Sequence, residues 1–209
     1  RDRSPSRGLG DVYKRQGPHR EYRQEWWRLS GRLQGHESDG TGYLTATFHR
    51  YTEVPKEYWD PEDKSGRGSS QLRVTVEALL PGRESAVRFG PLALPEAAPC
   101  VEVRQGHLRL GPVELRSKSD RFSDFPATFE FPGEGIQLQL VSEAPPSMPA
   151  TNGCVRCVDG HGLKRYDHAF VLGTGRAGGE QCTFEGTYSH SWENGISVWG
   201  EPSSPVSRA

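Results

Sequence analysis

Two clusters of aromatic and histidine residues contain the side chains of this sequence that could do chemistry. The segment FEGTYSHSWENG places Tyr188, His190 and Trp192 on one face of an expected strand, because strand side chains alternate between faces. His190 could act as a general acid or hold a water molecule, and aromatic faces beside it could stabilise a positive charge. Asp167 and His168, in RYDHAF, form a second candidate pair for acid–base chemistry.

The other cluster is EWW, near the start of the sequence. Trp26 and Trp27 are neighbours, so in a strand they point to opposite faces and cannot both enter one core. Trp27 is in phase with Leu29 and Leu33 and is expected to pack the core, whereas Trp26 faces a second layer, a ligand or a partner. Each cluster taken alone is also explained by core packing, because a buried Trp or Tyr needs only one polar partner.

The four cysteines offer little metal chemistry. Cys154 and Cys157 form a C-x-x-C, and a structural zinc site would need His161 and the distant Cys182 to complete it. We interpret the C-x-x-C as incidental loop thiols or a local disulfide. Histidine pairs with metal-ligand spacing, the G-x-S-x-G nucleophile motif and phosphate-binding glycine patterns are missing as well. The sequence therefore predicts neither a metal nor a cofactor.

The composition argues against some classes of function. The chain has 209 residues, of which 33% are hydrophobic, and this suits one domain of ordinary size or part of a larger protein. Its apolar runs, such as EALL and AFVL, are far shorter than the roughly 20 residues of a transmembrane helix. The formal net charge is -1, so the charge balance gives no reason to expect a nucleic acid as partner.

The hydrophobic period is two residues beyond the opening segment, which predicts strands rather than helices. WRLSGRL, YLTATFHR, LRVTVEALL and CTFEGTYSH alternate in this way, while VEVRQGHLRL and TFEFPGEGIQLQL read as hairpins with turns at 105–106 and 132–135. Many short strands divided by turns favour an all-β antiparallel barrel or β-sandwich with little helix. Residues 53–70 and 143–164 are expected to be long loops, and GTGRAGGE (173–180) a hairpin loop.

The first 16 residues, RDRSPSRGLGDVYKRQ, do not resemble part of a fold. They are basic and lack an apolar pattern, and DVYKRQ matches the translation of a transposon-end adapter used in sequencing libraries. We interpret residues 1–16 as a cloning or sequencing scar, with a basic RNA-binding arm or a nuclear signal as alternatives. The expected β-domain then covers 17–200, and 201–209 form a tail or a truncated linker. Under this interpretation the native N-terminus is missing, so the sequence does not indicate a compartment.

Two parts of the sequence resemble lipocalin-like proteins related to carotenoid hydratase, also called hydroxyneurosporene synthase. REYRQEWWRLSGRL and GYLTATFHRY resemble the E-W-W strand and the following F-F-R strand of that family, although Arg28 replaces a usual aromatic residue. RYDHAFVLGTGRAGGEQCTFEGTYSHSWENG resembles its tyrosine-bearing strand, glycine-rich hairpin and histidine segment, if one residue is deleted. The matching residues are Glu25, Trp26, Trp27, Gly31, Phe48, Arg50, Tyr188, His190 and Trp192.

The resemblance implies two lipocalin-like β-domains, of which this chain would supply the N-terminal one and lack the C-terminal one. In that family a cleft between the domains holds an isoprenoid or polyketide-like substrate, and known activities include adding water across a carbon–carbon double bond. Such chemistry needs an acid that protonates carbon, a group that holds water and aromatic faces around the cation. The family has an acidic residue before its histidine. This sequence has none before His190, so the imidazole is expected to lack an orienting carboxylate, and with it a fixed tautomer.

Two classes of function follow from these observations. The first is a hydratase (a lyase), or an isomerase or cyclase, that acts on a hydrophobic small molecule. The second is a binding module without turnover, either for a hydrophobic ligand or for a carbohydrate held on Trp26, Tyr58 and Trp59. The candidate catalytic residues are His190, Tyr188, Asp167 and His168. The candidate substrate-binding residues are Trp26, Trp27, His49, Tyr166 and Trp192.

Overall fold

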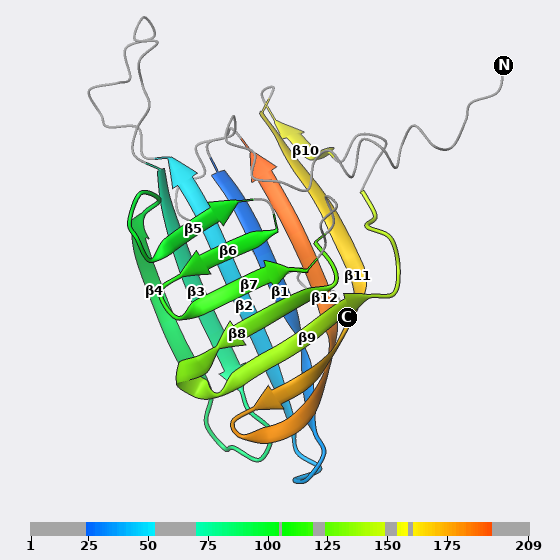
Figure 1. Cartoon of the computed structure of the whole chain (residues 1–209). Helices are drawn as coiled ribbons and strands as arrows, with labels where there is room; N and C mark the ends of the chain where they lie inside the picture. Colours follow the sequence, from blue (N-terminus) through cyan, green and yellow to red (C-terminus); the bar gives the residue numbers. More distant parts are fainter. Residues whose placement is uncertain are drawn as a thin grey trace, which may run out of the picture.

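A computed structural model describes residues 24–52, 70–104, 106–118, 124–148, 154–158 and 161–193. Within these residues the chain forms twelve strands and one short 3-10 helix, η2 (Figure 1). The elements are β1 (Gln24–Gly35), β2 (Thr41–Thr52), β3 (Ser70–Leu79), β4 (Val87–Pro95), β5 (Val101–Arg104), β6 (His107–Leu110), β7 (Val113–Ser117), β8 (Ala127–Phe131), η2 (Pro132–Glu134), β9 (Ile136–Ser142), β10 (Cys154–Val158), β11 (His161–Ala177) and β12 (Glu180–Glu193).

The described strands join into one antiparallel sheet that curls into a nearly closed barrel. The strand order is β4-β3-β2-β1-β12-β11-β9-β8-β7-β6-β5, and β10 pairs with β11 beside this path. In Figure 1 the strands β5 to β9 cross in front of the long strands β1 to β4 and β12. The structure confirms the all-β class and the antiparallel barrel that the period of two predicts.

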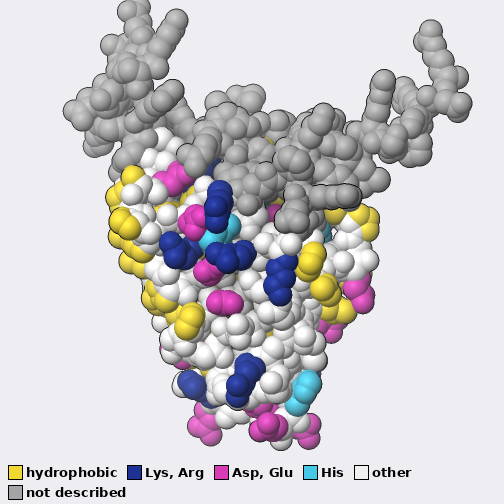
Figure 2. All heavy atoms as spheres, viewed as in Figure 1, with side chains coloured by type: hydrophobic (Ala, Val, Ile, Leu, Met, Phe, Trp, Pro, Cys, Tyr) yellow, Lys and Arg dark blue, Asp and Glu magenta, His cyan; other side chains and the backbone are white. Residues whose placement is uncertain are grey.

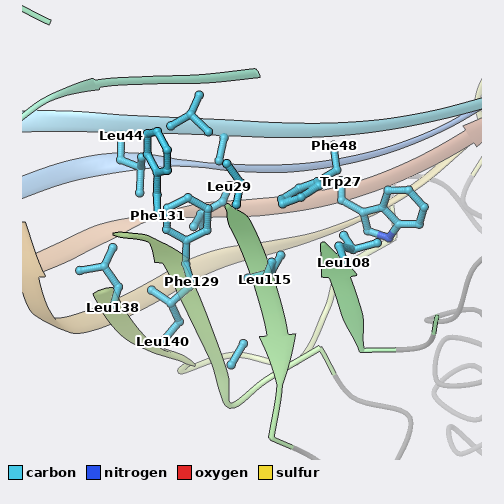
Figure 3. Close-up of a cluster of buried hydrophobic side chains, with 14 of the residues drawn as sticks. Trp27, Leu29, Leu44, Phe48, Leu108, Leu115, Phe129, Phe131, Leu138 and Leu140 are labelled. Atoms are coloured by element: carbon cyan, nitrogen blue, oxygen red, sulfur yellow. The ribbon is translucent and has the colours of Figure 1, made fainter. Parts of the chain in front are cut away.

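The inward positions of the strands build the core of the barrel. On β1 the side chains of Trp27, Leu29 and Leu33 are buried and the side chains between them are not, which confirms the predicted phase. Figure 3 shows Trp27 and Leu29, with Leu44 and Phe48 of β2, facing leucine and phenylalanine side chains from β6 to β9. Full burial of such a side chain is worth about 1.5–3 kcal/mol, so contact between the two walls stabilises the barrel.

Charged side chains cover the outer face of β5 to β7 (Figure 2). Glu102 pairs with Arg104 at 2.6 Å and Glu114 with Arg116 at 2.9 Å. His107 lies between the two carboxylates; its burial lowers the imidazole pKa, and the carboxylates oppose that shift. Exposed ion pairs of this kind add little to stability, but they keep this face of the barrel polar.

The structure confirms a hairpin turn within 173–180, but the predicted loop is too long. β11 continues to Ala177, so most of GTGRAGGE lies in a strand and the turn shrinks to Gly178 and Gly179. Both glycines have positive φ, at 66° and 94°, which residues with a side chain rarely adopt. Glycine was taken as a sign of a loop, but the glycines before the turn sit where β9 and β12 approach β11 closely.

The predicted loop at 143–164 is also partly wrong, because 154–158 form β10 and β11 begins at His161. This arrangement separates Cys182 from the C-x-x-C. β10 pairs with β11, where Cys154 is opposite Lys164; Lys164 is in turn opposite Trp192 of β12, and Cys182 lies ten positions from Trp192 along β12. At about 3.3 Å per residue the separation is roughly 33 Å, too far for a shared zinc ion.

The other predictions about connecting and terminal segments are only partly covered. The structure confirms the hairpins β5–β6 and β8–β9, with η2 at the second turn. The predicted loop 53–70 lies outside the described residues except for Ser70, and so do 1–16, 201–209, Tyr58 and Trp59. Among the described residues there is no helix with the length and apolar character that a membrane crossing requires.

Two facing glycines hold β1 and β12 close together. Gly31 is paired with Gly186 in the register of the two strands. A Cβ on Gly31 would lie 2.4 Å from the Glu185 carbonyl oxygen and 2.5 Å from the Phe184 ring. The Phe184 ring therefore occupies the space above both glycines, and no side chain fits at either position without moving the backbone.

We expect Gly31→Ala to lower the free energy of unfolding by about 2 kcal/mol, because overpacking against backbone atoms forces the two strands apart. Urea denaturation followed by tryptophan fluorescence measures the change. Gly133→Ala is the matched control, because that glycine is exposed and its added Cβ would meet only the Phe131 ring at 3.7 Å. Equal stability of the two variants would contradict this account of the glycine pair.

Candidate functional site

A row of polar side chains is buried at the end of the barrel where β1 begins and β2 and β12 end, which is the upper end in Figure 1. Arg50 Nε donates to Glu25 Oε2 at 3.0 Å, and Glu25 Oε1 lies 2.6 Å from His190 Nε2. All three side chains are at most 2% exposed. A buried carboxylate is costly unless it is paired, and Glu25 is paired on both of its oxygens.

The register of three adjacent strands brings these residues together. On β1, Glu25 is paired with Arg50 of β2 and with Trp192 of β12, and Trp27 is paired with His190. Glu25 is two residues before Trp27, so both side chains point into the barrel. The inner faces of β2, β1 and β12 therefore place a guanidinium, a carboxylate and an imidazole side by side.

The row continues on the other side of the imidazole. His190 Nδ1 lies 2.8 Å from the hydroxyl of Tyr166 on β11, and that hydroxyl donates to Asp124 Oδ2 at 2.5 Å. Asp124 precedes β8 and also forms a hydrogen bond with Tyr188 of β12. Four strands and the segment before β8 thus contribute to one connected set, which we call the inner polar row: Arg50, Glu25, His190, Tyr166, Asp124 and Tyr188.

Aromatic rings enclose the imidazole of His190. The ring of Trp27 stacks on it with a centroid distance of 4.9 Å, and those of Tyr166 and Trp192 lie 5.0 Å away at steeper angles. Aromatic faces attract a desolvated cation by about 2 kcal/mol. The surroundings of His190 therefore suit a protonated imidazole that Glu25 balances in charge.

Asp124 is the member of the inner polar row whose charge changes near neutral pH. Burial raises the pKa of the Asp124 carboxyl to about 7, and hydrogen bonds from Tyr166 and Tyr188 oppose that shift. Burial and the nearby Asp124 raise the pKa values of both tyrosines well above 10, so their hydroxyls stay protonated. Asp124 can consequently both donate and accept a proton around pH 7.

Asp124 also lines a small cavity whose walls are partly apolar and partly polar. Trp27, Leu108 and Phe125 form an apolar part, and Arg104, His107, Ser117 and Tyr188 also line the cavity. Its volume of about 20 Å³ is enough for a water molecule but not for an organic ligand. Within the described residues, the inward-facing side chains of the strands form a buried hydrophobic core.

The structure brings five of the candidate residues together and sets the others apart. Tyr188, His190, Tyr166, Trp27 and Trp192 lie inside the barrel around the inner polar row. The other four candidate residues do not belong to this row: Asp167, His168, Trp26 and His49.

His168 is close to the row without belonging to it. Its Nδ1 lies 2.8 Å from the hydroxyl of Ser142, and its Nε2 is 3.8 Å from Asp124 Oδ2, beyond hydrogen-bond distance. Burial lowers the pKa of His168 to about 4, so the imidazole is neutral at pH 7. Asp167, its neighbour, points away from the interior and pairs with Arg165 at 2.6 Å. The two do not form a catalytic pair.

Trp26 and His49 lie on the outer face of the sheet. Their rings stack with a centroid distance of 4.8 Å, and Tyr51 lies next to His49 at 5.2 Å. Burial, with Arg73 and Arg50 nearby, lowers the pKa of His49 to about 4. This outer stack and the inner polar row face opposite sides of the sheet, so no ligand touches both through the described residues.

The two carboxylates of the site, Glu25 and Asp124, are not predicted by the sequence patterns. The expectation that His190 has no orienting carboxylate is wrong, because Glu25 supplies one from a strand 165 positions earlier. The phase of Glu25 with Trp27 was the signal that could have found it. Asp124 lies between strands, where no periodic pattern indicates the direction of a side chain.

In the described part of the chain, His, Cys, Asp and Glu side chains form no group of three or more that could hold a metal ion.

We expect Glu25→Gln to lower the free energy of unfolding by about 3 kcal/mol or more, because it removes the negative charge from a fully buried ion pair with Arg50. Chemical denaturation at pH 7 provides the measurement. The matched control is Glu77→Gln, which breaks the exposed pair with Arg88 and should change stability far less. The role assigned to Glu25 fails if the two losses are similar.

The low pKa of His49 predicts a stability contribution that depends on pH. The unfolded imidazole titrates near 6.5 and the folded one near 4, so the unfolded chain binds more protons between these values. Stability is therefore lost as the pH falls from about 6.5 towards 4. His49→Phe keeps a ring against Trp26 and removes the titration. We expect this variant to lose less stability than the wild type between pH 7 and about pH 4.5 in urea titrations, and an equal loss would contradict the assignment.

Comparisons with known proteins bear on the fold. No protein-family model matches the sequence, and no curated protein matches it. The structure is similar to the crystal structure of a protein from Nitrosomonas europaea that carries the provisional name ATTH, with a TM-score of 0.67 and 14% sequence identity. The match covers 87% of this chain and 55% of that chain, so this chain spans about half of its length. At this identity the likeness shows the fold alone, and the fold is a lipocalin-like barrel.

Proposed function

We propose that this domain presents a buried acid to a hydrophobic small molecule, of isoprenoid or polyketide-like type, at the end of the barrel that holds the inner polar row. The observation that carries the proposal is the position of Asp124, whose carboxyl has a pKa of about 7 and lines a cavity beside the apolar side chains of Trp27, Leu108 and Phe125. A carboxyl with this pKa is suited to general acid–base catalysis at neutral pH.

The apolar part of the lining beside Asp124 suits an apolar group of the substrate. Trp27, Leu108 and Phe125 make up this part and offer no hydrogen-bonding group except the indole N–H, while Arg104, His107 and Ser117 line the cavity elsewhere. The faces of Trp27 and Phe125 can attract a positive charge that develops on carbon. This combination meets the needs of protonation at a carbon–carbon double bond.

The reaction we propose is the addition of water to a double bond, or its isomerisation. Asp124 gives its proton to one alkene carbon, and the other carbon becomes cationic. Water adds there and returns one proton to the carboxylate, or the cation loses a proton from a neighbouring carbon to give the isomer. Both routes conserve protons and charge, and neither needs a redox partner.

The packed interior indicates that the substrate lies against the end of the barrel instead of inside it. A cavity of about 20 Å³ cannot enclose an isoprenoid. A cleft shared with a further domain would supply the missing walls, as the resemblance to the carotenoid hydratase family implies. The similar structure from Nitrosomonas europaea is longer than this chain, which is compatible with such a domain.

The second candidate function is a binding module without turnover. The outer stack of Trp26, His49 and Tyr51 favours it, because stacked rings on a strand surface can hold an apolar molecule or a sugar ring. The two candidates place the ligand on opposite faces of the sheet. Substitutions at Asp124 and at Trp26 therefore distinguish them.

We expect Asp124→Asn to lower turnover of an acyclic isoprenoid alkene by about 10²–10⁴-fold, because the variant has no acid at this position. The whole chain would be incubated with the alkene in ¹⁸O-labelled water, with mass spectrometry of the products and quenching of tryptophan fluorescence as a separate measure of binding. Binding should change little in this variant.

Trp26→Ala is the control for this experiment, because it alters the outer face only, and we expect turnover to continue. Turnover that survives Asp124→Asn would reject the catalytic assignment. Binding without product in the wild type, lost in Trp26→Ala, would support the binding module instead.

A further inference from the structure

The hydrogen bonds around Tyr166 restrict where protons can sit in the inner polar row. The Tyr166 hydroxyl carries one proton and lies within 2.8 Å of both His190 Nδ1 and Asp124 Oδ2. It can donate to one of these atoms, and it can only accept from the other. The proton states of His190 and Asp124 are therefore linked through one hydroxyl.

The other nitrogen of His190 is fixed by Glu25. Because Arg50 holds the carboxylate of Glu25, His190 Nε2 carries a proton and donates it to Glu25 Oε1 at 2.6 Å. The protonation of His190 then depends only on Nδ1. With a proton on Nδ1, His190 is an imidazolium that donates to Tyr166; without one, Nδ1 accepts a hydrogen bond from Tyr166.

Two arrangements with the same number of protons satisfy every one of these hydrogen bonds. In the first, His190 is an imidazolium, Tyr166 donates to Asp124, and Asp124 is a carboxylate. In the second, Asp124 is a carboxylic acid that donates to the Tyr166 oxygen, Tyr166 donates to His190 Nδ1, and His190 is neutral. The step between them moves the Nδ1 proton to the Tyr166 oxygen while the original Tyr166 proton moves to Asp124.

We propose that His190, Tyr166 and Asp124 form a proton relay, in which His190 stores a proton that reaches Asp124 through the Tyr166 hydroxyl. The proposal rests on the proposed function for its purpose, because it explains how Asp124 regains a proton after giving one to a substrate. Its chemistry requires only the row itself. Tyr166 is a positioning residue here, and it returns to its starting state after each transfer.

The surroundings of the relay stabilise both arrangements. In the first, Glu25 balances the charge of the His190 imidazolium, which also faces three aromatic rings. In the second, burial favours the uncharged carboxylic acid of Asp124. The groups that face the relay are Glu25 on β1, Arg50 on β2, His168 on β11 and Tyr188 on β12, with Arg104 of β5 and His107 of β6 at the cavity wall.

Nuclear magnetic resonance of the whole chain without ligand tests the relay. Labelled ¹⁵N-histidine reports the charge on His190, and labelled ¹³C-aspartate reports that of Asp124. A shared proton is lost from both sites together, so we expect both signals of the wild type to change with one midpoint as the pH rises. Separate midpoints for the two residues in the wild type would overturn the relay.

Tyr166→Phe removes the connecting hydroxyl and should separate the two midpoints by about one pH unit or more. Tyr188→Phe is the matched control: it removes a hydroxyl that bonds to Asp124 and to Tyr166, but it leaves the Tyr166 hydroxyl that connects His190 to Asp124, so the midpoints should move together. Midpoints that stay equal in Tyr166→Phe would contradict the relay. The wild-type titration decides the question alone if a variant does not fold.

These measurements need no turnover, so they separate the relay from the proposed function. A shared midpoint in a protein that converts no alkene would retain the relay and reject the enzyme. Loss of turnover in Asp124→Asn combined with separate wild-type midpoints would retain the enzyme and reject the relay.

Discussion

The hydrogen bond between Glu25 and His190 depends on one register between β1 and β12, and the rest of the inner polar row depends on that bond. A shift of one residue would turn Glu25 out of the barrel and leave Arg50 buried without its carboxylate. The Gly31–Gly186 pair opposes such a shift, because Phe184 fills the space that only two facing glycines leave. The close packing at Gly31 and Gly186 in the middle of the strands therefore maintains the register that the Glu25–His190 hydrogen bond at their end requires.

The barrel divides its length between a stabilising part and a polar part. Below the row the interior is filled by apolar side chains, which favour folding and leave little freedom for the strands to move. At the upper end the same strands hold two carboxyl groups, an imidazole and a guanidinium away from water, which costs free energy unless each is paired. Burial of the apolar side chains offsets the free-energy cost of burying these polar groups. The long strands β1, β11 and β12 connect the two parts of the barrel.

The residues that resemble the carotenoid hydratase family meet in space even though they are far apart in sequence. Glu25, Trp27 and Arg50 from the opening strands contact or neighbour His190 and Trp192 from the last one. Trp26, which also matches, lies on the other face, where it stacks on His49. The motif therefore describes two features of the sheet, a buried polar row and an outer aromatic stack, and the row contains the acid–base groups.

Sequence alone determined many of the strands and which of their faces is buried, because alternation is a local property of a stretch of residues. It predicted an all-β barrel or sandwich, the inward direction of Trp27 and the shared face of Tyr188, His190 and Trp192. It failed at GTGRAGGE, where glycine marks close contact between strands instead of a loop. Only the tertiary structure decided that Glu25 orients His190 and that Asp124 completes the row, because hydrogen bonds between distant segments depend on register and on the path of a loop. Neither of these leaves a periodic trace in the sequence.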